Sequence, residues 1–199
     1  MKHSFYLSFL IAVTAIAFLA SSCSREKLED PNSPAFKLRE SEKLVIPPSI
    51  ELPLNAGGNL RVATYYATGV QQYKAQNKAG GGYEWVFVAP KADLYNSNNQ
   101  KVGTHSAGPT WQLYGALDSM FAQAYSPART AASTQAATID WLLLQTKTGK
   151  TPTGIFSAVE YVQRIDTKGG KAPSVAPLTL TETVEVPYTA VYRFSKRKL

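Results

Sequence analysis

A histidine and a serine stand side by side in GTHSAGPTW, residues 103–111, and this pair raises the question of nucleophilic catalysis. The sequence has two histidines, and His105 is the one that lies outside the N-terminal leader. A hydrolase would use His105 as the base for a hydroxyl, with a carboxylate behind it. The carboxylates that could take this role are Asp118, Asp140 and Asp166. Because Ser106 would face away from His105 in an extended strand, and because no GxSxG motif occurs, this hydrolase is the alternative hypothesis.

The same stretch also has a structural and a binding interpretation. As structure, Gly108-Pro109 makes a turn, Trp111 anchors the core and His105 hydrogen-bonds a nearby carbonyl. As a binding site, the turn presents His105 and Gln112 beside aromatic walls to a sugar or another polar ligand. We therefore expect a non-catalytic binding or structural module, with no catalytic residue assigned.

Metal and cofactor motifs are not expected. Zinc and copper sites need clustered histidine, cysteine or carboxylate ligands, and the chain has one cysteine and two histidines. The oxygen-rich stretch ADLYNSNNQ, residues 92–100, could hold calcium, but its composition favours an Asn-rich turn. GGG at 80–82 lacks the Lys-Ser/Thr ending of a phosphate loop and predicts a hairpin turn. We expect no cofactor and no nucleic-acid partner, although several tyrosines accompany basic residues on predicted strands.

The first 22 residues have the features of a lipoprotein signal peptide. Lys2 precedes an apolar run over residues 5–19, and small residues stand directly before Cys23, as in a bacterial lipobox. The run is too short for a transmembrane anchor, and secretion without lipidation is the other alternative. The resemblance implies lipidation of Cys23, a membrane anchor and a bacterial cell envelope location, with Ser24 favouring the outer membrane. The expected partners are this membrane and an envelope glycan or protein.

The chain after Cys23 divides into a tether and one domain. Residues 23–43 mix charges with prolines, which predicts a flexible tether, and residues 44–199 form a single all-β domain. The formal net charge is +7, and SKRK at 195–198 is its densest cluster. A solvated terminus explains this cluster, and attraction to anionic lipids or polymers is the alternative.

Short Tyr-, Val- and Phe-rich segments alternate with Gly, Pro and Asn, which predicts an antiparallel β-sandwich or β-barrel. The candidate strands are 60–66, 69–75, 83–89, 109–114, 139–145, 155–165 and 182–194. Both faces of 83–89 are apolar, so we expect this strand to be buried on both sides. Segment 155–165 could also be helical, and 126–137 could be a short helix or a loop.

Several phrases in a fixed order resemble one known family. They are GVQQY (69–73), WVFVAPKADL (85–94), GTHSAGPTW (103–111), WLLL (141–144), VQRIDTKGGKAP (162–173) and VPYTAVYRF (186–194). Over about residues 50–195 the chain resembles the domain-of-unknown-function 3455 family of secreted bacterial and fungal proteins. The resemblance implies no established activity. Some members carry dehydrogenase names, but this sequence has no dinucleotide-binding fingerprint that would support such an activity. The resemblance also implies that Ala75 and the region of Ala176, where family members carry cysteines, are neighbours.

Residues within these phrases form the candidate ligand-binding set. They are Gln71, Tyr73, His105, Trp111, Arg164 and Tyr188, with Gln163 and Tyr192 beside them. Arg164 stands out because a charge inside an apolar strand must be paired or must face the surface. Pairing with Asp140 or Asp166 is the first explanation, and anchoring of an anionic ligand is the second.

Overall fold

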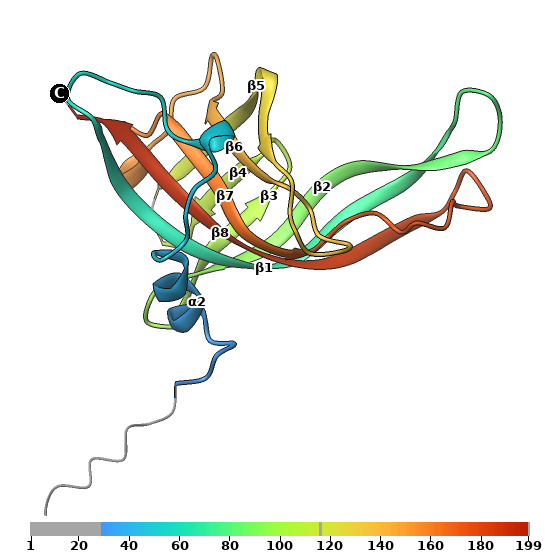
Figure 1. Cartoon of the computed structure of the whole chain (residues 1–199), viewed down its shortest axis with the longest axis horizontal. Helices are drawn as coiled ribbons and strands as arrows, with labels where there is room; N and C mark the ends of the chain where they lie inside the picture. Colours follow the sequence, from blue (N-terminus) through green and yellow to red (C-terminus); the bar gives the residue numbers. More distant parts are fainter. Residues whose placement is uncertain (1–28, 116, 199) are drawn as a thin grey trace, which may run out of the picture. The chain divides into compact units, whose positions relative to one another are not determined.

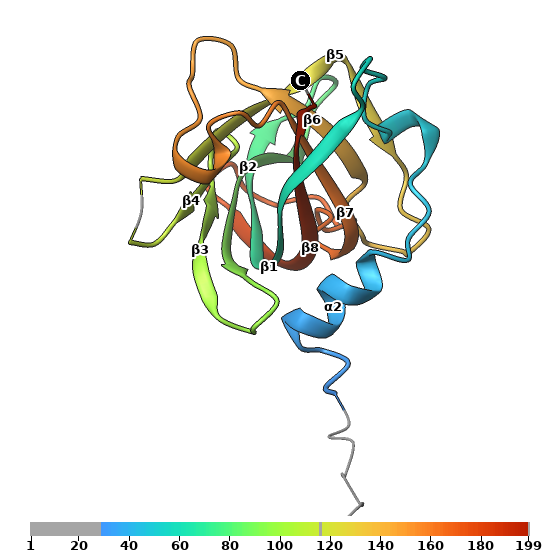
Figure 2. The ribbon, with the colours of Figure 1, turned by 90° about the vertical axis from the view of Figure 1, so that its left-hand side faces the viewer.

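Eight antiparallel strands follow one another around a closed barrel, and each strand pairs with its neighbour in sequence (Figures 1 and 2). The computed structural model describes residues 29–115 and 117–198. The strands are β1 Asn59–Asn77, β2 Tyr83–Tyr95, β3 Lys101–Ser106, β4 Thr110–Leu113, β5 Ser119–Ala131, β6 Trp141–Thr146, β7 Tyr161–Gly169 and β8 Thr183–Arg197. The first and last strands close the ring, from Asn59 opposite Arg197 to Lys74 opposite Thr183. The all-β prediction is confirmed, and the barrel is the correct one of its two alternatives.

The interior of the barrel holds one of two apolar clusters. Because successive side chains of a strand alternate between its faces, Tyr65 and Ala67 of β1 point inward while Tyr66 points outward. The inner cluster includes Trp111, Phe156 and Phe194, all without exposed surface. Phe156 belongs to the 3₁₀ helix η2, Gly154–Phe156, so the segment 155–165 is only partly a strand.

The outer cluster lies beneath an N-terminal segment that we call the strap, residues 34–54. The strap contains the helix α2, Pro34–Ser41, and the 3₁₀ helix η1, Pro48–Ile50. Its Leu38 and Ile50 are buried against Leu143 and Val191 on the outside of the barrel. Residues 23–43 were expected to form a flexible tether, but Pro34–Ser41 form the helix α2. Although the segment is polar on average, its apolar side chains, such as Leu38, pack against the barrel. The leader, residues 1–22, and Cys23 lie outside the described residues.

Hydrogen bonds to strap carbonyls fix its path along the barrel. Gln163 Nε2 donates to Ile50 O at 2.8 Å, and Arg193 Nη2 donates to Ser41 O at 2.6 Å. Arg129 donates from Nε and Nη2 to the carbonyls of Ser49 and Glu51. The strap belongs to the same compact unit as the barrel, and this unit begins at Pro31. In the described part of the chain, no helix has the length and apolarity needed to cross a bilayer.

Three strands continue beyond the ring and form an arm, which projects to the right of the barrel in Figure 1. The arm consists of the end of β1, the start of β2 and the start of β8. The expectation that 83–89 is buried on both faces is wrong, because Phe87 and Val88 are 49% and 50% exposed. Among residues 29–115 and 117–198, no second layer covers Phe87 and Val88. Trp85, the partner of Ala75 across β1 and β2, donates from Nε1 to Val175 O at 2.9 Å, which brings the region of Ala176 to this part of the arm.

Two strands were not among the candidates. β3 contains Gly103 and polar residues, and β5 contains Pro127 within the segment for which a helix or loop was considered. The pairing of β5 with β6 is irregular between Ala124 and Arg129, and this irregularity accommodates the proline. Neighbouring strands thus determined β structure where the local sequence did not favour it.

Candidate functional site

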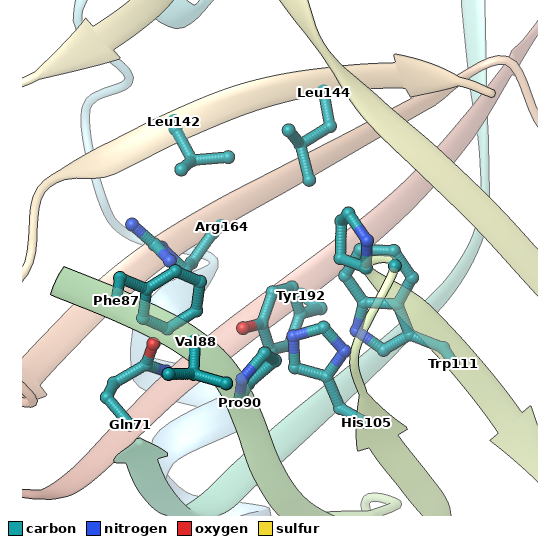
Figure 3. A pocket seen from close by; sticks show the side chains of 12 residues that line it. Gln71, Phe87, Val88, Pro90, His105, Trp111, Leu142, Leu144, Arg164 and Tyr192 are labelled. Carbon is teal, nitrogen blue, oxygen red and sulfur yellow. The ribbon is translucent and has the colours of Figure 1, made fainter. Parts of the chain in front are cut away.

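A cavity of about 330 Å³ opens inside the barrel next to the arm (Figure 3). Side chains from seven of the eight strands or their turns surround it. The lining residues are Gln71, Phe87, Val88, Pro90, His105, Gly108, Pro109, Trp111, Leu142, Leu144, Arg164 and Tyr192. The size lies at the lower end of the range for small-molecule sites, and the mixture of apolar walls and few polar groups is typical of them.

Strand register explains the aromatic floor of the cavity. His105 of β3 lies directly opposite Trp111 of β4 in the antiparallel pair. Their rings therefore stack, with centroids 4.4 Å apart and planes 6° from parallel. Tyr192 of β8 meets the His105 ring edge-on, with centroids 4.8 Å apart. Beyond this floor, Tyr65, Phe156 and Phe194 fill the barrel with further aromatic contacts.

His105 is a neutral, acceptor-bearing ring in this site. Its side chain is 3% exposed, and burial lowers the pKa of His105 to about 3, while the hydrogen bond to Thr110 O at 2.9 Å opposes that shift. A carbonyl oxygen only accepts, so Nδ1 carries the hydrogen and Nε2 carries a lone pair. The positive charge of Arg164 lowers the pKa of His105 further.

The partners expected for a catalytic histidine are elsewhere. Asp118 accepts from the backbone of Ile155, and Asp140 accepts from the backbone of Ser133. Ser106 is exposed and faces away from the interior, as its position next to His105 predicted. Within residues 29–115 and 117–198, no hydrogen bond joins His105 to a carboxylate or a hydroxyl. Gln112 is also exposed on the outside of β4, so it does not accompany His105 in the cavity.

Arg164 is an inward-facing cation. In the barrel register it lies between Leu142 of β6 and Tyr192 of β8, both of which line the cavity. Its Nε and Nη2 donate to the backbone oxygen of Asp140 at 3.2 and 2.8 Å. The expected pairing with the Asp140 or Asp166 carboxylate is therefore replaced by two bonds to a carbonyl, which fix the guanidinium without neutralising it.

Two buried donors of the lining lack partners in the described part of the protein. Gln71 is 2% exposed and its Nε2 makes no hydrogen bond, and Trp111 is fully buried with its Nε1 equally unpaired. An unsatisfied buried donor costs about 1–3 kcal/mol. Such groups are rare in folded proteins.

The structure brings together four of the six candidate ligand-binding residues as lining of one cavity: Gln71, His105, Trp111 and Arg164. Tyr188 is buried next to it, with its hydroxyl 3.5 Å from that of Tyr192. Tyr73 donates from its hydroxyl to Gly170 O at 2.6 Å. Gln163 faces the strap on the outside of the barrel.

The apolar walls of the cavity were not predicted from the sequence. Leu142 and Leu144 lie across the cavity from Gln71 and His105 in Figure 3, and Phe87, Val88 and Pro90 of β2 close another side. Period-two alternation within WLLL could have placed Leu142 and Leu144 on one face, but not on the same face of the barrel as Arg164. In the described ranges no group of three or more histidine, cysteine or acidic residues is placed to hold a metal ion.

Fold and site together define a closed eight-stranded barrel with a ligand-sized cavity at one end. Residues 56–196 match the family model described as "Protein of unknown function (DUF3455)", and the chain belongs to this family. No curated protein and no solved structure shows significant similarity to the chain. The match covers all eight strands, from before Asn59 to the last residues of β8, and leaves out the strap.

Proposed function

We propose that the protein is a non-catalytic binding module that holds a small, largely apolar molecule in the barrel cavity. The observation that carries the proposal is the pair of unpartnered buried donors, Gln71 Nε2 and Trp111 Nε1, in a lining that is otherwise mostly apolar. A ligand that supplies acceptors to these donors and covers the apolar walls would offset the cost of the unpaired donors and bury apolar surface.

Binding explains the chemistry of His105 better than hydrolysis does. A general base needs a pKa near the working pH and a partner that orients the ring. The pKa of His105 lies near 3, and the group that orients its ring is a backbone carbonyl. A neutral Nε2 acts as a hydrogen-bond acceptor for a ligand hydroxyl or N–H, which is a binding role.

Thermal unfolding with a ligand panel tests the proposal. The panel contains alkyl and aryl acids with their amides and alcohols, peptidoglycan fragments and short glycans. A ligand at one hundred times its dissociation constant stabilises by about 2.7 kcal/mol, which raises the Tm by about 5–10 °C at this chain length.

A cavity-filling variant shows where the ligand binds. Leu142→Phe places a larger ring at the cavity wall, and we expect it to remove the Tm increase. Leu54→Phe is the matched control, because Leu54 is fully exposed on the strap. A Tm increase that survives Leu142→Phe unchanged would locate binding elsewhere and contradict the proposal.

We also propose that this module works in a bacterial cell envelope, anchored through a lipidated Cys23. Support comes from the leader and the small residues before Cys23, and from the basic excess of the chain, which favours anionic surfaces. An envelope glycan or protein is then its neighbour, and the ligand is a molecule of that compartment.

A further inference from the structure

The polar groups that line the cavity are biased toward donors. Gln71 Nε2 and Trp111 Nε1 are unpaired, and Arg164 adds the N–H groups of a guanidinium that donates to the Asp140 carbonyl and interacts with the Tyr192 hydroxyl. Arg164 is also the one ionisable group with a formal charge at neutral pH among the described lining residues, since burial keeps His105 neutral. No aspartate or glutamate lines the cavity in the part that the structure describes.

The charge of Arg164 acts throughout the cavity. It lowers the pKa of Tyr192 and of Tyr188 against the larger opposite effect of burial, and it acts in the same direction on Tyr73. No ion pair neutralises Arg164 in the described ranges, whereas Arg61 and Arg197 each meet a glutamate on the outside. A cation held in place and left without a counter-ion produces a positive potential in an enclosed site.

The rest of the lining limits the ligand to one anionic group on an apolar body. Phe87, Val88, Pro90, Leu142 and Leu144 offer no side-chain hydrogen-bonding group. A phosphate dianion would meet one cation where phosphate sites usually supply more positive charge and more donors. A carboxylate matches a guanidinium fork, because two parallel N–H···O bonds join the planar groups.

We propose that the cavity takes a monocarboxylic acid with an apolar body, its carboxylate held by Arg164 and Gln71 and its apolar part lying against Leu142, Leu144 and Phe87. This inference rests on the proposed binding function and names its ligand class. The stacked pair of His105 and Trp111 forms the floor beneath the ligand.

Isothermal titration with two probes of the same shape tests the ligand class. The probes are 4-phenylbutyrate and its neutral counterpart 4-phenylbutanamide, titrated into the purified chain at pH 7. We expect the carboxylate to bind about tenfold to hundredfold more tightly than the amide, as charge-assisted hydrogen bonds do. Arg164→Met should weaken carboxylate binding more than amide binding and so remove the preference for the carboxylate.

Lys168→Met is the matched control, because Lys168 is an exposed cation on the same strand β7. It should preserve the preference for the carboxylate. If Arg164→Met fails to fold, Gln71→Leu decides, since it removes an N–H donor without changing the charge. We expect it to weaken the carboxylate more than the amide.

The outcomes separate the two proposals. Equal binding of acid and amide by the wild-type protein would overturn the carboxylate assignment and leave the binding function intact. A preference that persists in Arg164→Met but disappears in Lys168→Met would place the charge recognition outside the cavity and overturn the assignment as well. Failure of both probes to bind, with no Tm increase from any member of the panel, would overturn both proposals.

Discussion

His105 illustrates how a residue type can suggest one chemistry and its surroundings another. A lone histidine next to a serine suggests a nucleophile and its base. The register of β3 and β4 instead stacks its ring on Trp111, and the Thr110 carbonyl fixes its tautomer. The ring therefore acts in the site as a flat neutral surface with one acceptor nitrogen.

The neutral state of His105 predicts a loss of stability in acid. The pKa is about 3 in the folded protein and 6.5 in the unfolded chain, so the unfolded chain binds the extra proton between these values. The contribution is fully present above pH 6.5 and decreases as the pH falls from 6.5 toward 3, by about 1.4 kcal/mol per unit. His105→Gln should remove it. Urea unfolding at pH 7 and pH 5 should show wild type losing about 2 kcal/mol more than the variant.

The control for this measurement is Ser106→Ala, an exposed neighbour on the other face of β3. It should keep the wild-type dependence on pH. A variant His105→Gln whose stability falls between pH 7 and pH 5 as much as that of wild type would show that His105 is not held neutral by the fold.

For Arg164, the sequence showed that a charged side chain in an apolar strand needs a partner, but it did not predict which group that partner is. A charge in an apolar strand was recognisable from the run VQRID alone. Its actual partner is the main-chain carbonyl of Asp140, the residue before β6. The sequence does not indicate which side chain will reach a given main-chain carbonyl. The same limit applies to Gln71, whose lack of a partner follows from the closure of the barrel around it.

At the scale of elements, strands with β-branched and aromatic residues were predictable and those with small residues were not. β2 was predicted from period-two alternation, β6 from the unbroken apolar run WLLL, and β8 from its β-branched and aromatic residues, although β2 extends further than expected. β3 contains Gly103 and polar residues and β5 contains Pro127, so their local strand propensity is weak, and both strands form through pairing with their neighbours. The strap was missed because Leu38 and Ile50 are separated by polar residues, and no local period connects them.

The strap should contribute strongly to stability. Ile50 has no exposed surface and packs in the outer cluster with Leu143 and Val191. Ile50→Ala should lower the free energy of unfolding by about 2–5 kcal/mol, because it removes buried methyl groups and leaves a cavity. Leu54→Ala, at the fully exposed end of the same strap, should change it by about 0.5 kcal/mol or less. Equal effects of the two substitutions in urea unfolding would mean that the strap is not docked in solution.

At the scale of the whole molecule, the barrel is filled at one end and hollow at the other. Tyr65, Phe156 and Phe194 pack the filled end, and the cavity occupies the end next to the arm. The sequence predicts the aromatic residues, but it does not predict which end they fill. That depends on the register of β1 against β8, two strands separated by more than one hundred residues.

The proposed anchor belongs to this scale because it determines where the whole protein resides. Expressed in a bacterium that processes lipoproteins and grown with an alkyne-labelled fatty acid, the wild-type chain should incorporate the label and fractionate with membranes. Cys23→Ala should lose both properties, while Ser24→Ala should keep the label. Label retained in Cys23→Ala would contradict lipidation at that cysteine.

Closure of the barrel has a consequence for how this unit can be joined to other proteins. Asn59 pairs with Arg197, and Lys198 N donates to Gly58 O at 3.0 Å, so the first and last residues of the barrel lie next to each other. The family match, residues 56–196, begins and ends at nearly the same place. A domain whose ends meet can be inserted into a surface loop of a host protein, or reconnected in a different order, without stretching either partner. The barrel can therefore be transferred between proteins as one domain. A fusion protein that lacks the strap would need another segment to cover the outer apolar cluster of the barrel.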